Sequence, residues 1–321
     1  MNTRVHVVVG ILYNATKDKV LITKRTRKQF LAGYWEFPGG KVKKNEDPFT
    51  ALKREFYEEL GVNLKSAKKI IKISHDYLKK KVLLDVWEID DWEGQPASLE
   101  DQEMTWSNKN DLFKYKFPEA DKRIIKTLQL PDIYGISKKS YIDYPHLFSK
   151  LKKYFNSGLK IFQLRLHLEG NNISKENIEQ LYTEAKRNNS ILILNGTASD
   201  SELYAIDGIH LKSKNLYKYD KRPISEDYIL GASCHTELEI EQAKKLCVDY
   251  VFISPVLGTS SHPDKAPLGW RNFQQLVKKA NMPVYALGGM SPNDLNKAKE
   301  NGAYGIAMIS HIKKLPLSEK I

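Results

Sequence analysis

The chain has 321 residues, which exceeds one typical domain and suits two. Lysine and arginine number 51 against 39 aspartates and glutamates, so the net charge of +12 favours anionic partners such as nucleotides and phosphate esters. Only Cys234 and Cys247 are present, which excludes a disulfide framework and a zinc-ligand spacing.

Targeting signals are not evident in the sequence. No apolar run is long enough to span a bilayer, and Asn2, Arg4 and His6 interrupt the start where a signal peptide needs apolar residues. The lysines are scattered rather than gathered into one arm, so stable nucleic-acid binding is not expected. We expect a cytoplasmic protein that does not associate with membranes, and the sequence does not indicate its oligomeric state.

The first 130 residues predict an α/β domain with a mixed sheet and helices on both sides. Strands are predicted at residues 5–13, 20–23, 67–75 and 82–87, and a closing helix at residues 121–128. Lys79, Lys80 and Lys81 are most simply a solvated hairpin turn.

Residues 40–62 place specific residues at the spacing G-x5-E-x7-R-E-φ-x-E-E-x-G-φ, where φ is apolar. Apolar residues at three- and four-residue intervals predict a helix that stops at Gly61. Glu55, Glu58 and Glu59 then share one helical face, where their charges repel. A divalent cation relieves this repulsion, and carboxylate oxygens suit Mg²⁺ or Mn²⁺. The alternative is an acidic, solvated helix after a glycine-rich turn.

This segment resembles the Nudix box, and residues 35–41 resemble the lead-in of MutT-type Nudix hydrolases. The resemblance implies a loop-helix-loop that holds Mg²⁺ against a nucleoside triphosphate, whose hydrolysis releases pyrophosphate. Glu55, Glu58 and Glu59 would be catalytic metal ligands, together with the Gly39 or Gly40 carbonyl.

Other positions acquire roles through the same resemblance. Glu100 would complete the metal shell or act as general base, or else is an exposed loop acid. Arg25 and Lys41 would meet phosphate oxygens, or are plain surface cations. Arg54 would orient a glutamate through a salt bridge, and Glu46 would have a similar supporting role.

The base pocket is the part where the sequence departs from the bacterial MutT pattern. Phe37 and residues 117–121 resemble the segments that enclose an oxidised guanine, which implies 8-oxo-dGTP as substrate. Asp121 stands where that pattern has Asn. A carboxylate must be protonated to donate a hydrogen bond to the purine edge, so the preference for oxidised guanine depends on Asp121.

The pattern changes near Pro131, which predicts a second domain over residues 131–321. Eight short apolar strands alternate with amphipathic helices and predict a (β/α)8 TIM barrel, whose active site lies at the carboxyl ends of the strands. The strands are predicted at residues 133–137, 161–166, 191–195, 208–211, 229–233, 250–254, 284–287 and 305–309.

The second domain resembles thiamin phosphate synthase and its TenI relatives, on segments that include residues 163–165, 207–210, 231–235, 255–262 and 287–290. Gly288, Gly289 and Ser310 match the phosphate-binding position of such barrels. The ligand implied is a phosphorylated thiazole or pyrimidine. His210 and His235 would be acid-base groups or hydrogen-bonded structural residues.

Several positions depart from the synthase pattern. Gly196 and Asn215 stand where the family has metal-binding aspartates, His167 stands where it has lysine, and Ser261-His262 replaces Thr-Lys. Without those carboxylates, efficient thiamin phosphate synthesis is not expected.

Three hypotheses remain open from the sequence. The chain is a hydrolase of oxidised dGTP, a Nudix hydrolase of a thiamin-related pyrophosphate, or a hydrolase whose barrel is a ligand-binding or regulatory module.

Overall fold

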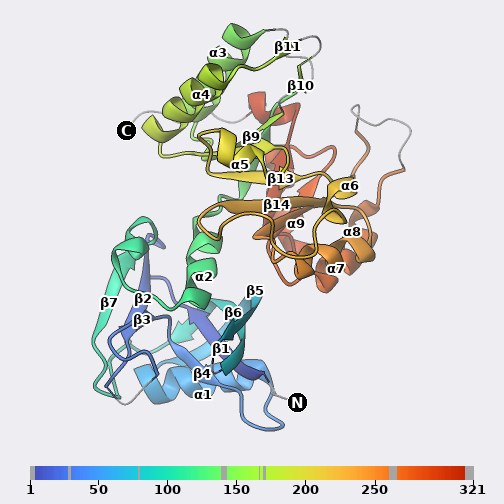
Figure 1. The fold of residues 1–321 in the computed structure, drawn as a ribbon. Coiled ribbons are helices and arrows are strands. Elements are labelled where there is room, and N and C mark those ends of the chain that lie inside the picture. Colours follow the sequence, from blue (N-terminus) through green and yellow to red (C-terminus); the bar gives the residue numbers. More distant parts are fainter. Residues whose placement is uncertain are drawn as a thin grey trace. The chain divides into compact units, whose positions relative to one another are not determined.

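The computed structural model describes residues 4–27, 30–78, 80–138, 143–165, 167–168, 171–259 and 266–314. It divides the chain into two compact units, Met1–Gln129 and Leu130–Ile321 (Figure 1). Lys79, Leu166, Ser261 and His262, which entered the sequence-based predictions, lie outside the described residues. Within the described part of the chain, no helix combines the length and the apolar character needed to cross a membrane.

Unit 1 contains a four-stranded and a three-stranded sheet, which confirms the predicted mixed sheet. The first has the order β4-β1-β6-β5, and β1 and β6 run parallel while the other pairs are antiparallel. Its strands are β1 (Val5–Ile11), β4 (Gly39–Lys41), β5 (Asn63–Tyr77) and β6 (Lys80–Glu93). The second has the order β3-β2-β7, with β3 (Trp35–Glu36), β2 (Lys19–Lys24) and β7 (Met104–Asn108).

The predicted strands differ from the observed ones mainly at their ends. The first strand stops at Ile11 rather than at Tyr13, which forms only an isolated bridge to Val20. Strands β5 and β6 are longer than predicted because they pair along almost their whole length, including polar residues whose side chains point to solvent.

The helix predicted from the spaced carboxylates is α1 (Pro48–Leu60), and its predicted stop is confirmed. The Asp47 side chain accepts hydrogen bonds from the backbone N–H groups of Phe49 and Thr50 and so caps the first turn. Gly61 ends the helix at a φ of 67°, a conformation that favours glycine. The other helices of unit 1 are η1 (Lys109–Lys114) and α2 (Glu119–Gln129), which begins two residues before the predicted start.

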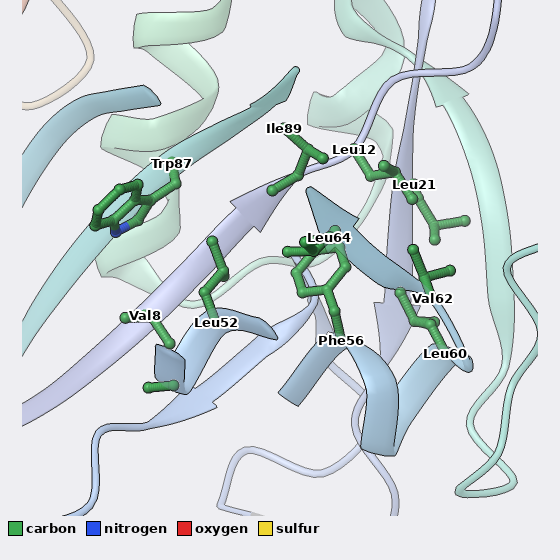
Figure 2. Close-up of a cluster of buried hydrophobic side chains, with 11 residues drawn as sticks. Val8, Leu12, Leu21, Leu52, Phe56, Leu60, Val62, Leu64, Trp87 and Ile89 are labelled. Atoms are coloured by element: carbon green, nitrogen blue, oxygen red, sulfur yellow. The ribbon is translucent and has the colours of Figure 1, made fainter. Parts of the chain in front are cut away.

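One apolar face of α1 packs on the first sheet. Leu52, Phe56 and Leu60 are buried against residues of the strands and of the segment after α1, and Figure 2 shows this cluster. Gly10 lies beneath the ring of Phe56, where a Cβ atom would overlap the ring. The absent side chain therefore lets α1 lie close to β1.

Unit 2 is a closed barrel of eight parallel strands, which confirms the predicted (β/α)8 fold. The strands are β8 (Ile133–Ile136), β9 (Ile161–Arg165), β12 (Ile191–Asn195), β13 (Gly208–Leu211), β14 (Ile229–Cys234), β15 (Tyr250–Ile253), β16 (Val284–Leu287) and β17 (Gly305–Met308). The α-helices are α3 (Tyr144–Asn156), α4 (Lys175–Arg187), α5 (Asp200–Leu203), α6 (Ser213–Leu216), α7 (Glu237–Lys245), α8 (Gly269–Lys279) and α9 (Leu295–Glu300). Smaller elements are β10 (His167–Leu168), β11 (Asn171–Asn172), η2 (Pro292–Asp294) and η3 (His311–Lys314).

Aromatic side chains fill the barrel interior. Tyr134, Tyr250, Phe252 and Tyr285 are almost fully buried and contact one another edge to face or at a tilt. The hydroxyls of these tyrosines need hydrogen-bond partners inside the barrel.

Replacing Phe56 by Ala should destabilise unit 1 by about 3–5 kcal/mol, because a large buried ring leaves a cavity. Urea unfolding followed by tryptophan fluorescence measures this, since Trp87 belongs to the same cluster. Tyr57→Ala is the control, because the adjacent Tyr57 is 59% exposed. Equal unfolding midpoints for the two variants would contradict this account of the core.

Candidate functional site

Arg54 gathers the acidic residues around α1. Its Nε and Nη2 atoms donate to Glu46 Oε1 and Oε2 at 2.8 and 2.9 Å, and its Nη1 atom donates to Glu55 Oε1 at 2.7 Å and Glu58 Oε2 at 3.0 Å. The Nη2 atom also donates to the Lys41 carbonyl at 3.1 Å, which ties the group to β4. The hydrogen bonds from Arg54 lower the pKa of Glu46 to about 2. One guanidinium thus compensates three carboxylates.

Glu59 is held separately from this group. Its Oε2 atom accepts a hydrogen bond from the Gly39 backbone N–H at 3.1 Å. Burial raises the pKa of Glu59 to about 8, and the nearby carboxyls of Glu36, Glu55 and Glu100 add to the increase. The carboxyl therefore lies among other acids with little positive charge to compensate it.

Two glycines of β4 allow close approaches near these carboxylates, one to β1 and one to Glu55. Gly39 has a φ of 144°, and a Cβ atom there would overlap the Val8 carbonyl oxygen of β1. At Gly40, a Cβ atom would overlap the Glu55 carboxyl. The space beside Gly40 is thus filled by a carboxylate that a side chain would displace.

The donor set has the chemistry of a divalent cation site. Glu55, Glu58 and Glu59 supply hard oxygen atoms, as do the carbonyls of Gly39 and Gly40. In the arrangement described, however, no three acidic, histidine or cysteine side chains among the described residues form a group that could hold a metal ion. The hydrogen bonds explain this separation, because Glu55 and Glu58 accept from Arg54 whereas Glu59 accepts from the Gly39 N–H.

The loop that carries Glu100 is hydrogen-bonded to the end of α1. The backbone N–H groups of Ala97 and Leu99 donate to the carbonyls of Leu60 and Glu59 at 3.1 and 2.9 Å. These bonds satisfy carbonyls that the helix end leaves without partners. Glu100 itself is exposed, and its charge is near enough to raise the pKa of Glu59.

Three cations lie near one another beside the carboxylates. Arg25 pairs with Glu36 at 2.7 Å and donates to the Phe30 carbonyl at 2.6 Å, whereas Lys41 is exposed and has no carboxylate partner among the described residues. Burial lowers the pKa of Lys80, and the charges of Lys41 and Arg25 lower it further, which places the three within electrostatic reach. Lys80 was not predicted as a site residue, because a lysine run at a hairpin has no local signal that distinguishes it from a solvated turn.

The predicted base-pocket residues come together at the start of α2. The ring of Phe37 stacks on Phe117 with centroids 5.3 Å apart, and both are buried. Asp121 is 6% exposed, and burial raises its pKa to about 7, with a smaller contribution from Glu36 and an opposing one from Arg25. A buried carboxyl with this pKa is partly protonated at neutral pH.

The barrel glycines predicted to bind phosphate occupy left-handed conformations. Gly288 and Gly289 have φ angles of 100° and 70°, and Cβ atoms there would overlap Pro255 and Leu257. Ser310 is half-buried after β17. The backbone of this turn is therefore closely covered by the segment after β15.

Gly196 and Asn215 stand where the synthase pattern has metal-binding aspartates. Beside Gly196, Asp200 Oδ2 accepts from the Thr197 backbone N–H at 2.6 Å and from its hydroxyl at 3.0 Å. Asn215 is buried in the short helix α6. Asn215 offers no carboxylate to a cation, and the Asp200 carboxylate, which fills the space beside Gly196, is bonded to Thr197.

The two strand-end histidines differ in their surroundings. His235 Nδ1 lies 2.7 Å from the Ser254 carbonyl, so this nitrogen carries the proton and Nε2 is left as an acceptor when the ring is neutral. His210 is fully buried, and burial lowers its pKa to about 3. His210 is therefore neutral near pH 7.

The fold and the carboxylate-bearing helix define a hydrolase domain joined to a parallel (β/α)8 barrel. A family model of the Nudix domain matches residues 8–127, and a model of thiamine monophosphate synthase matches residues 133–312. The chain belongs to both families, and unit 1 is a Nudix hydrolase domain. Nudix hydrolases generally use divalent metal cations.

Individual relatives agree with this division. The 8-oxo-dGTP diphosphatase of Buchnera aphidicola subsp. Schizaphis graminum (strain Sg) is 37% identical over 124 residues, which are 39% of this chain and 92% of that protein. The putative thiamine-phosphate synthase 2 of Aquifex aeolicus (strain VF5) is 30% identical over 185 residues, which are 57% of this chain and 98% of that protein. The thiamine-phosphate synthase of Prochlorococcus marinus (strain AS9601) is 28% identical over 63% of this chain, which spans only 56% of that relative.

Replacing Gly40 by Ala should lower the affinity for Mn²⁺ by roughly tenfold or more, because the added Cβ displaces the Glu55 carboxyl. Electron paramagnetic resonance of free Mn²⁺ measures the affinity. Gly258→Ala is the control, since a Cβ atom there meets open space. Unchanged Mn²⁺ binding by the Gly40 variant would show that Glu55 is not a ligand.

Proposed function

We propose that unit 1 is a Mg²⁺-dependent pyrophosphohydrolase of nucleoside triphosphates that converts 8-oxo-dGTP to 8-oxo-dGMP and pyrophosphate. The observation that carries this proposal is that Glu55, Glu58 and Glu59 all belong to α1, with the Glu55 carboxyl in the space that Gly40 leaves without a side chain. The similarity to the 8-oxo-dGTP diphosphatase of Buchnera supports the substrate. Such an activity removes an oxidised precursor before DNA replication can use it.

The residues have distinct parts in this reaction. Glu55, Glu58 and Glu59 would hold Mg²⁺, or Mn²⁺ in its place, with the Gly39 and Gly40 carbonyls and Glu100. When bound, such an ion would neutralise charge on the phosphates and make a water molecule more acidic. For this to happen, Glu55 and Glu58 must turn from Arg54, which keeps its two bonds to Glu46. Arg54 and Glu46 are thus positioning residues.

The cations next to the carboxylates suit the phosphate chain of the substrate. Lys41 and Lys80 have no carboxylate partner among the described residues, so they are available to phosphate oxygens. Arg25 is paired with Glu36 and would contact phosphate with the remainder of its guanidinium. Charge-assisted bonds of this kind hold an anion more strongly than neutral ones.

Asp121 decides which base the pocket accepts. With a pKa of about 7, its protonated form can donate a hydrogen bond to a purine carbonyl at neutral pH. The protonated carboxyl thereby supplies the hydrogen-bond donor that an ionised carboxylate lacks. Phe37 and Phe117 would form the apolar wall of the same pocket.

We take residues 1–130 as the hydrolase domain and residues 131–321 as the barrel domain. The barrel would bind a phosphorylated thiazole or pyrimidine at Gly288, Gly289 and Ser310. It would act as a ligand-binding module or as an isomerase, and it would not make thiamin phosphate efficiently. The amide at Asn215, together with the bonds that hold the Asp200 carboxylate beside Gly196 to Thr197, supports this restriction. We place the protein in the cytoplasm, where the thiols of Cys234 and Cys247 would remain reduced.

A second candidate keeps the hydrolase but changes its substrate to a thiamin-related pyrophosphate. The observation that favours it is the barrel itself, whose family includes thiamine-phosphate synthases. Values of kcat/KM for 8-oxo-dGTP, dGTP and thiamin diphosphate with Mg²⁺ decide between the two. A clear preference for 8-oxo-dGTP supports the first proposal, and a preference for thiamin diphosphate replaces it with the second.

Base selectivity should depend on pH through Asp121. Because burial raises the pKa of Asp121 to about 7, the donor form dominates below pH 7 and is lost above it. The ratio of kcat/KM for 8-oxo-dGTP to that for dGTP should therefore fall as pH rises from 6 to about 8.5, a span set by this pKa. The effects of ionisable groups that act equally on both substrates cancel in this ratio.

Asp121→Asn should keep a high ratio across this pH range, because the amide donates at every pH. Glu119→Gln is the matched control, since Glu119 begins the same helix and its side chain is 61% exposed. A wild-type ratio that does not change with pH would remove Asp121 from the base pocket.

Lys80→Ala should lower kcat/KM by roughly tenfold or more, because a hydrogen bond between charged groups at the phosphate is lost. Lys81→Ala provides the comparison, since the neighbouring Lys81 faces Asp76 at 3.7 Å instead. If steady-state kinetics show equal losses in the two variants, Lys80 has no specific contact with substrate.

A further inference from the structure

The helix that carries Asp121 has its first turn capped from a distant strand. Helix α2 begins at Glu119, and the residue before it, Pro118, has no side-chain acceptor for the free N–H groups of a helix start. The Ala120 N–H instead donates to the Tyr77 hydroxyl oxygen at 3.3 Å, across 43 positions of the sequence. The end of β5 therefore holds the turn in which Asp121 lies.

The same tyrosine stands opposite Lys80. Tyr77 and Lys80 form the last pair in the ladder of β5 and β6. Opposite residues of an antiparallel pair project from the same face of a sheet, so the two side chains share one face. This end of the ladder thus carries both the cap of α2 and one of the cations that suit a phosphate.

The Tyr77 ring reaches a second such cation through Phe30. The two rings meet edge to face, with centroids 5.9 Å apart. The Phe30 carbonyl accepts from Arg25 Nη1 at 2.6 Å, while Arg25 Nη2 pairs with Glu36 at 2.7 Å. The Tyr77 ring also contacts His75, with centroids 4.3 Å apart. Neighbouring rings thus fix the position of the Tyr77 hydroxyl.

The ring and the hydroxyl of Tyr77 have separable parts in this arrangement. The ring packs on Phe30, whose carbonyl holds Arg25, whereas the hydroxyl accepts from Ala120 in α2. A net hydrogen bond contributes roughly 1 kcal/mol, which is enough to influence how often the first turn of a helix opens locally. Phenylalanine in place of Tyr77 keeps the ring and removes this bond alone.

We propose that Tyr77 is a positioning residue that couples phosphate binding to base selection. Phosphate bound by Arg25 and Lys80 fixes the ring of Tyr77 through its neighbours. The hydroxyl then holds the first turn of α2 closed, which keeps Asp121 in the base pocket. This inference rests on the proposed function, which assigns phosphate to the two cations and the base to Asp121.

The exchange of the Ala120 amide proton with water, measured by NMR, tests the coupling without a catalytic step. In the full-length protein labelled with nitrogen-15 alanine, inorganic pyrophosphate, a probe that has no base, should slow this exchange in the wild type. In Tyr77→Phe the exchange should be about fivefold faster, because one hydrogen bond is lost, and pyrophosphate should leave it unchanged. Equal exchange rates in the two proteins, or a wild-type rate that pyrophosphate does not change, overturn the proposal.

Base selectivity measures the consequence for the reaction. At pH 6, the ratio of kcat/KM for 8-oxo-dGTP to that for dGTP should fall about fivefold in Tyr77→Phe, whereas the affinity for Mn²⁺ should stay at the wild-type value. Tyr57→Phe is the matched control, since it removes a hydroxyl from a tyrosine that is 59% exposed. A ratio in Tyr77→Phe equal to that of the control would overturn the positioning role.

The outcomes for this coupling and for the proposed function are distinguishable. If the wild type shows no preference for 8-oxo-dGTP, the proposed substrate fails, and the Ala120 exchange with pyrophosphate still decides whether Tyr77 acts between the cations and α2. Selective hydrolysis by the wild type with an unaltered ratio in Tyr77→Phe keeps the proposed function and removes the coupling.

Discussion

Mutual repulsion among carboxylates is the constraint on which the rest of the Nudix domain depends. Glu55, Glu58 and Glu59 are brought together by the helical repeat of α1, and such like charges destabilise a helix unless they are compensated. The structure compensates two of them through Arg54 and the third through one backbone N–H, that of Gly39. These bonds compensate the repulsion in the arrangement without a cation, and under the proposed function a divalent cation would take over that part.

The surrounding fold holds α1 where these bonds can form. Gly10 allows the helix to approach β1 through Phe56, Gly39 allows β4 to approach β1 at Val8, and Gly40 leaves room for the Glu55 carboxyl. The loop that carries Glu100 is bonded to the last carbonyls of α1. Positions without side chains thus contribute as much to the site as the charged residues, because they decide how closely the backbone segments can approach.

The sequence predicted the architecture well because its signals are local. The periodic apolar residues and Gly61 defined α1, and eight apolar segments separated by amphipathic ones defined the barrel. The predicted ends of the strands were less accurate. In β5 and β6, for example, pairing extends the strands beyond their apolar residues. Local patterns carry no information on such long-range pairing.

The electrostatic features of the sites could not be predicted in this way. Nothing in the lysine run at the hairpin distinguishes Lys80, whose relation to Lys41 and Arg25 arises only when distant strands meet. The raised pKa of Asp121 depends on burial and on Glu36, and the neutral state of His210 depends on its enclosure in the barrel. Such properties belong to the environment of a residue and not to its identity.

Under the proposed function, the α1 carboxylates bring about hydrolysis by holding a divalent cation. The most direct test of this claim is the rate of pyrophosphate release from 8-oxo-dGTP as a function of Mg²⁺ concentration in the wild type, Glu58→Gln and Glu103→Gln. Glu103 is a suitable control because it pairs with Lys24 at 2.7 Å and its side chain is 59% exposed. The wild type and the control should depend on Mg²⁺, and Glu58→Gln should lose roughly a hundredfold or more in rate. Full activity of Glu58→Gln, or activity of the wild type in the presence of a chelator, would contradict the account.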